Sequence, residues 1–171
     1  MGELLAALGQ DPDGEHLIDT PRRVVDGLIE LLTPEPFALT TFANDGGYSE
    51  LVLVRDIPFT SLCEHHMLPF RGIAHVGYVP SERIVGLSKL ARVVDWFARG
   101  LQVQERLTAQ IADHLERHLD PLGVGVALEA EHMCMSIRGV RAGGATTVTS
   151  AFRGDIARDP ALRVQFSSGA R

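Results

Sequence analysis

The sequence has few cysteines and lacks any long apolar run. Two cysteines in 171 residues, with no sign of an export signal, predict reduced thiols in the cytosol instead of a disulfide framework. No stretch approaches the roughly 20 apolar residues of a membrane-spanning helix. The apolar run within residues 1–14 is too short for a signal peptide and carries acids where such a peptide has a basic start. We therefore expect a cytoplasmic protein that does not enter a membrane.

An excess of basic charge is also missing. The formal net charge is −6 at pH 7, which argues against nucleic acid as a partner. Of the sixteen lysines and arginines, only Lys89 is a lysine. An anionic small molecule remains compatible with this charge balance if basic side chains converge locally. With 45% hydrophobic and 22% charged residues, the composition is typical of one globular domain with a real core.

Both cysteines have histidines close by in the sequence. Cys63 and His66 stand three residues apart, and Cys134 follows His132 by two. A thiolate and an imidazole at such spacing can take two corners of a tetrahedral metal site. A zinc ion held by Cys63, His66 and Cys134 would have three protein ligands and one position left for water, as catalytic zinc sites do. The alternative for either half alone is a buried cysteine beside an incidental histidine.

Apolar residues at helical spacing predict four helices, at residues 1–8, 20–32, 88–101 and 103–115. Thr20 is expected to be the N-cap of the second helix, with Pro21 at its first helical position. Ser88 is expected to cap the third helix. Residues 37–47 have the composition of a loop.

Alternating and β-branched segments predict four strands, at residues 51–59, 72–79, 124–138 and 145–152. Residues 84–87 are expected to form an extended connector, and the tail from Arg153 is polar. Two hairpins separated by a helix pair indicate an α+β domain with helices packed on one face of an antiparallel sheet. On a strand, His132, Cys134, Ser136 and Arg138 would share one face.

Four motifs in this order make the sequence resemble GTP cyclohydrolase I. They are residues 61–66, 84–90, 102–108 and 132–139, and the similarity extends from residue 19 to residue 152. The resemblance implies the T-fold, in which subunit sheets join into a barrel, typically a decamer with active sites between subunits. It also implies one domain over residues 1–171, with a helical segment and loop at 1–47, a catalytic core at 48–153 and a tail at 154–171.

The family's chemistry implies that zinc activates water to open the imidazole ring of GTP, with loss of formate and formation of 7,8-dihydroneopterin triphosphate. His132 would be the proton donor and His65 a second histidine of the site, provided that the loop bends to bring it there. Each remaining residue matches a position of the family's site. Ser88 is placed at the ribose, Glu105 with Gln104 as a helper at the guanine, and Lys89, Arg92, Arg138 and Arg23 at the triphosphate.

Other interpretations stay open at this stage. Glu105 and Gln104 alone would suggest a solvated helix face, and His132 a structural histidine. A zinc nucleobase deaminase needs a closely spaced cysteine pair that this chain lacks. A catalytically silent T-fold protein would usually lose a ligand or the guanine-reading glutamate. The nitrile reductases of the same fold use a cysteine nucleophile without the zinc trio.

Overall fold

The computed structural model describes residues 1–170, which fall into two compact units that divide after Thr33. The first unit holds helices α1 (Gly2–Ala7) and α2 (Thr20–Leu32). Both predicted helices are therefore confirmed, but Asp19 and not Thr20 is the N-cap residue of α2. None of the described residues of α2 is buried within the chain.

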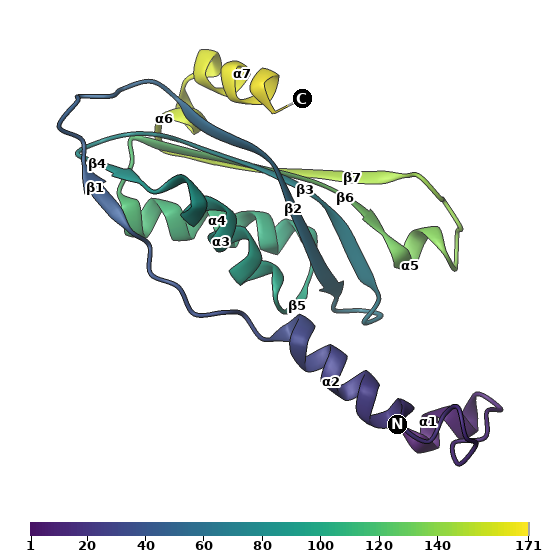
Figure 1. Cartoon of the computed structure of the whole chain (residues 1–171). Coiled ribbons are helices and arrows are strands. Elements are labelled where there is room, and N and C mark those ends of the chain that lie inside the picture. Colours follow the sequence, from purple (N-terminus) through teal and green to yellow (C-terminus); the bar gives the residue numbers. More distant parts are fainter. Residues whose placement is uncertain (171) are drawn as a thin grey trace. The chain divides into compact units, whose positions relative to one another are not determined.

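A five-stranded sheet forms the second unit, in the order β5-β2-β3-β6-β7 (Figure 1). Its four long strands are antiparallel, and they are β2 (Val52–Cys63), β3 (Pro69–Val79), β6 (Gly123–His132) and β7 (Thr146–Arg153). The short β5 (Leu101–Gln102) runs parallel to the end of β2, where Leu101 pairs with Leu62. Both predicted hairpins are present, and the first is longer than predicted because β2 continues to Cys63.

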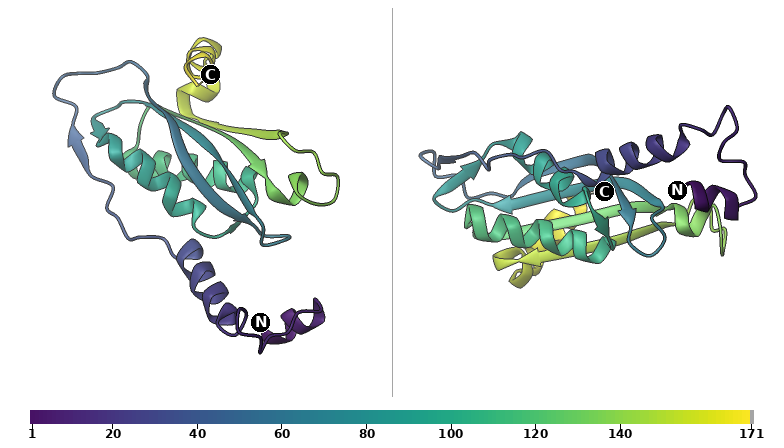
Figure 2. Two further views of the ribbon diagram at one scale, coloured as in Figure 1. Left: turned by 45° about the vertical axis from the view of Figure 1, so that its right-hand side comes forward. Right: turned by 90° about the horizontal axis from the view of Figure 1, so that it is seen from below.

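Helices α3 (Leu87–Ala98) and α4 (Gln104–Leu119) cover one face of this sheet (Figure 2). Their apolar stripes are fully buried against the strands, and burial of such side chains stabilises a fold by about 1.5–3 kcal/mol each. The α+β prediction is confirmed. Ser88, however, lies inside α3 and does not cap it: Gly86 is the N-cap residue, and the main-chain N–H of Lys89 already donates to its carbonyl over 2.8 Å.

The prediction of a loop at residues 37–47 is wrong in part. Within the predicted loop, β1 (Thr41–Ala43) pairs with β4 (Arg83–Val85), which lies in the predicted connector. The polar tail, for which no element was predicted, forms α6 (Gly154–Arg158) and α7 (Pro160–Gly169). Phe166 of α7 is buried on the sheet face that α3 and α4 leave open, over Gly125, where a Cβ atom would come within 2.8 Å of its ring. Among the helices described, none is long and apolar enough to span a bilayer.

Candidate metal centre and active site

Three side chains converge at the end of the sheet where β2 stops. The ligand atoms of Cys63, His66 and Cys134 all lie within 4.8 Å of one another, and no other such group occurs among residues 1–170. Tetrahedral zinc with ordinary bond lengths would separate a sulfur from a nitrogen by about 3.6 Å. The Sγ of Cys63 lies 3.9 Å from Nδ1 of His66. Two thiols and an imidazole at this spacing fit zinc.

A tight turn brings both histidines of the loop to Cys63. The carbonyl of Cys63 accepts from the main-chain N–H of Met67 over 2.8 Å, and Met67 has a left-handed φ of 53°. The chain therefore bends directly after the strand, and the rings of His65 and His66 turn to the same side. Nδ1 of His65 lies 3.8 Å from Sγ of Cys63. The loop therefore bends as the prediction of His65 in the site required.

The prediction that β6 continues past His132 is wrong. The ladder between β3 and β6 ends with the pair Phe70 and His132, and the next residue of β3 is Pro69, which has no N–H to donate. The chain then forms the single turn α5 (Met133–Ser136), which carries Cys134. Cys134 and Arg138 consequently do not share a strand face with His132. Cys134 still reaches Cys63, because the turn of α5 folds back toward the end of β2.

The thiol of Cys134 has a raised pKa. Burial is the largest cause, and the neighbouring Cys63 adds to it through its charge and a hydrogen bond. Two thiolates side by side repel each other unless a cation lies between them. A divalent metal supplies that charge and favours deprotonation of both thiols. The electrostatics of the pair therefore also fit a metal.

His132 lies next to this group and is held on two sides. Its Nε2 is 2.8 Å from Oε1 of Gln104, and its ring stacks on Phe70 at a centroid distance of 4.6 Å. Burial lowers the pKa of His132, whereas the carboxylate of Glu105 raises it, with burial the larger influence. Glu105 is exposed in the first turn of α4, close enough for its charge to act on His132. The arrangement can pass a proton beside the metal group.

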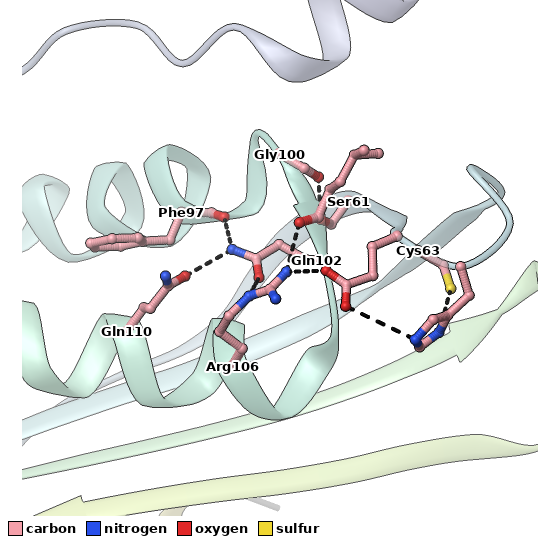
Figure 3. A network of polar contacts seen from close by, with 10 residues as sticks. Ser61, Cys63, Phe97, Gly100, Gln102, Arg106 and Gln110 are labelled. Atoms are coloured by element: carbon pink, nitrogen blue, oxygen red, sulfur yellow. Dashed lines mark hydrogen bonds and ion pairs between the residues drawn. The ribbon is translucent and has the colours of Figure 1, made fainter.

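A chain of polar contacts ties the histidine loop to α4 (Figure 3). Gln102 accepts from Nε of Arg106 over 3.0 Å, and Arg106 forms an ion pair with Glu64. The other carboxylate oxygen of Glu64 lies 3.9 Å from Nε2 of His65. Neither Glu64 nor Arg106 was predicted as a site residue. Both lie inside the motifs named above, so the motifs were the signal that could have identified them.

Comparison with known proteins agrees with this geometry. The family model of GTP cyclohydrolase I matches residues 1–171. The chain belongs to the GTP cyclohydrolase I family. A GTP cyclohydrolase 1 of Streptomyces griseus subsp. griseus is 55% identical over 173 residues, which cover 97% of this chain and 85% of that protein. One of Allorhizobium ampelinum is 53% identical over 168 residues, covering 95% and 84%. Both the predicted family and the prediction of an enzyme are confirmed.

The fold of this chain is also similar to that of a solved structure. The archaeosine synthase QueF-Like in its apo form superposes with a TM-score of 0.50 at 18% identity, over 61% of this chain and 93% of that one. At this identity the similarity concerns the fold alone. The predicted T-fold is confirmed.

Of the other residues predicted from the family, one lies beside the metal group and three lie away from it. Nη1 of Arg138 lies 3.2 Å from Nε2 of His66, so this cation is beside the metal group. Ser88, Lys89 and Arg92 lie in the first two turns of α3, a helix of 12 residues and thus about 18 Å long. Its other end leads into β5 beside Cys63, so these three residues lie away from the metal group within one chain (Figure 1).

Arg23 belongs to the first unit. Its guanidinium pairs with Asp19 of the same helix over 3.2 Å, and both side chains are more than half exposed. An exposed pair of this kind contributes little to stability. Arg23 is therefore accessible to an anion, and its contact with a triphosphate stays a prediction.

Proposed function

We propose that this enzyme hydrolyses the imidazole ring of GTP with the help of zinc, releases formate and forms 7,8-dihydroneopterin triphosphate. The observation that carries the proposal is the group of Cys63, His66 and Cys134, with His132 two residues before Cys134 and Glu105 close enough to act on the pKa of His132. Membership of the GTP cyclohydrolase I family supports the same reaction. The enzyme would act in the cytoplasm, where both thiols stay reduced.

Zinc would be held by Cys63, His66 and Cys134. Three protein ligands are the number found in catalytic zinc sites, which keep one position open. When bound there, zinc supplies Lewis acidity and lowers the pKa of a water molecule to about 7. A two-thiolate, one-imidazole set favours zinc over magnesium or calcium, which prefer oxygen ligands.

His132 would transfer the proton that ring opening requires. Hydrolysis at carbon 8 of guanine releases a proton from water and consumes one at the neighbouring ring nitrogen. A neutral imidazole can take the first proton and return it to the nitrogen, so the exchange balances at one group. His65, whose Nδ1 lies 3.8 Å from Sγ of Cys63, is the second candidate for proton transfer.

Glu105 would select guanine. A carboxylate can accept hydrogen bonds from the ring imino group and the exocyclic amine of guanine together, and adenine does not present this pair of donors. The side chain is exposed at the start of α4, where it is free to meet a ligand. Its carboxylate acts on the pKa of His132, so it lies near the group proposed to transfer the proton.

The triphosphate and ribose would be bound by Ser88, Lys89, Arg92 and Arg138, with Arg23 as a further cation. Because the first three lie away from the metal group within one chain, a complete site needs α3 of a neighbouring subunit. The sheet has an outer edge at β7 and another along most of β2, and such edges readily pair with further strands. A homo-oligomer with sites between subunits, such as a decamer, would supply both the neighbouring α3 and the strands that pair with these edges.

The experiment that tests the reaction is incubation of the purified protein with GTP. Formate should appear together with a product that gives pterin fluorescence after oxidation. ATP should give neither product. Formate without a pterin product would contradict the proposed rearrangement, and the absence of both would contradict the reaction.

A further inference from the structure

Gln104 is a polar side chain in the core of the protein. It lies in the first turn of α4 with 1% of its surface exposed. Its Nε2 lies 3.1 Å from the carbonyl oxygen of Leu128 and 2.9 Å from that of Thr147. It also lies 3.1 Å from Oγ1 of Thr149. Both polar atoms of the side-chain amide are thus bonded inside the chain, since Oε1 faces His132.

These contacts allow only one orientation of the amide. Carbonyl oxygens accept hydrogen bonds and cannot donate, so the group that faces Leu128 and Thr147 must be the NH₂ group. The reversed amide would place Oε1 against two carbonyl oxygens in a buried site. Buried polar groups left unpaired in that way lose the hydrogen bonds that water supplies in the unfolded chain, so the reversed amide is disfavoured. Oε1 therefore points to His132.

The orientation of Gln104 decides where His132 carries its proton. Oε1 is an acceptor, and Nε2 of His132 lies 2.8 Å from it, so Nε2 must be the N–H nitrogen. In a neutral imidazole the other nitrogen, Nδ1, then has the free lone pair. Stacking on Phe70, with the two ring planes only 4° apart, holds the plane of the imidazole.

Further hydrogen bonds secure this part of α4. The Oγ1 of Thr108 donates to the main-chain carbonyl of Gln104 over 2.7 Å, and it lies 2.7 Å from Oγ1 of Thr149. Thr149 belongs to β7 and Thr108 to α4, so the hydroxyl pair links helix and sheet beside the amide. The position of Oε1 is consequently determined by elements on both sides.

We propose that Gln104 is a positioning residue, which holds His132 in the tautomer protonated on Nε2 and leaves Nδ1 as the nitrogen that exchanges protons with the reactants. The catalytic consequence rests on the proposed function, whereas the tautomer is a property of the protein without substrate. Guanine recognition then belongs to Glu105, because the side-chain amide of Gln104 is fully engaged within the chain.

The test measures the tautomer directly. Zinc-loaded protein with ¹³C- and ¹⁵N-labelled histidine is studied by NMR, and the His132 signals are assigned by their loss in His132→Asn. Wild-type protein should show Nε2–H. Gln104→Leu removes the acceptor and should give a mixture of tautomers, with kcat for formate release lowered roughly tenfold or more and KM for GTP nearly unchanged.

Two variants serve as controls for simple damage to packing. Gln104→Glu keeps an acceptor for His132, and its protonated form can also donate to a carbonyl, so it should keep the Nε2–H tautomer and restore much of kcat. Thr149→Val removes one acceptor of the amide and leaves the contact with His132, so it should also keep the tautomer. Circular dichroism and zinc content confirm folding in every variant.

Each outcome supports or overturns the positioning role of Gln104. A wild-type His132 protonated on Nδ1 overturns the inference, even if Gln104→Leu does not fold. A Leu variant with the wild-type tautomer and kcat also overturns it, as does a raised KM with unchanged kcat, since that result would place Gln104 on the substrate. A wild-type protein that shows Nε2–H but releases no formate would overturn the proposed reaction and support the positioning role.

Discussion

At the scale of single residues, Glu105 has the exposure expected of a group that binds a ligand. Glu105→Gln should raise KM for GTP strongly, because an amide offers one acceptor where the carboxylate offers two. Stability should change by no more than about 0.5 kcal/mol, as for most surface substitutions. Steady-state kinetics and urea unfolding check both parts.

Glu116→Gln is a matched control for this change, because Glu116 is also exposed on α4. It should leave KM for GTP unaltered. Unchanged kinetics in Glu105→Gln would remove the guanine-reading role from Glu105.

His114 is a second residue with a distinct environment. Among the described residues, it alone has a buried side-chain nitrogen, Nε2, without a hydrogen-bond partner. Its pKa is lowered, first by burial and then by the charges of His118 and Arg117. The rings of Phe37 and Phe97, which pack on its other sides, carry no charge. Neutral His114 is therefore the form that suits the fold.

This environment makes stability depend on pH. The unfolded chain takes up a proton at His114 near pH 6.5, while the folded chain does so only at lower pH. The free energy of unfolding should thus be unaffected by His114 at pH 8 and should fall as the pH drops through that window. His114→Leu should show a smaller loss between pH 8 and pH 5.5 in urea unfolding. Equal losses in the two proteins would contradict this role of His114.

At the scale of elements, the start of α3 is suited to phosphate. Main-chain N–H groups point out of a helix N-terminus, and Lys89 lies in the first turn of α3. A compact ammonium can meet one phosphate oxygen, whereas a guanidinium needs a wider arrangement. Lys89→Arg should therefore raise KM for GTP several-fold, with folding and zinc content unchanged.

Binding of guanosine, which has no phosphates, measures the base contacts separately and should hardly change in Lys89→Arg. The exposed Arg158 of α6 offers a control, since Arg158→Lys should alter neither value. Wild-type KM in Lys89→Arg would show that only positive charge is needed at this position.

The elements also show what the sequence could and could not predict. Local periodicity identified the two hairpins and the pair α3 and α4, because each has its own apolar pattern. It indicated extended chain at residues 84–87 but missed β1 and its pairing with β4, which joins residues about 42 positions apart, as in the pair Phe42 and Ile84. The end of β6 depended on Pro69 of the neighbouring strand. In α7, Leu162 and Phe166 are four residues apart, as on one helix face, so the sequence does carry a local indication of this helix.

The candidate site, too, could be predicted from the sequence only in part. Cys63, His66 and Cys134 were predicted from rare residue types near one another in the sequence. The contact between Gln104 and His132 joins residues 28 positions apart and has no local pattern, so only the folded chain reveals it. The placement of Ser88, Lys89 and Arg92 away from the metal group likewise follows from the direction of α3.

At the scale of the whole molecule, the proposal that sites are shared between subunits predicts complementation. Cys134→Ser lacks the metal group, and Lys89→Ala lacks a triphosphate contact, so each alone should form little product. In oligomers assembled from equal amounts of both, about a quarter of the interfaces would combine an intact metal group with an intact Lys89. Formate release should return toward that fraction of wild-type activity.

Mass spectrometry of the mixed oligomers confirms that both variants are present. Cys134→Ser mixed with Cys63→Ser is the control, since both changes affect the same metal group and should not complement. Mixed oligomers of Cys134→Ser and Lys89→Ala that stay inactive would contradict a site shared between subunits.

The dependence of turnover on zinc tests most directly the claim that Cys63, His66 and Cys134 hold a catalytic zinc ion. Metal-free protein is titrated with zinc while formate release from GTP is measured, with Cys134→Ser as the control. Activity should rise and level off at about one zinc per chain, and most helical circular dichroism should persist without metal. Cys134→Ser should bind little zinc and stay inactive, because a serine hydroxyl is a poor zinc ligand. Full formate release from metal-free protein, or stoichiometric zinc in active Cys134→Ser, would contradict the account.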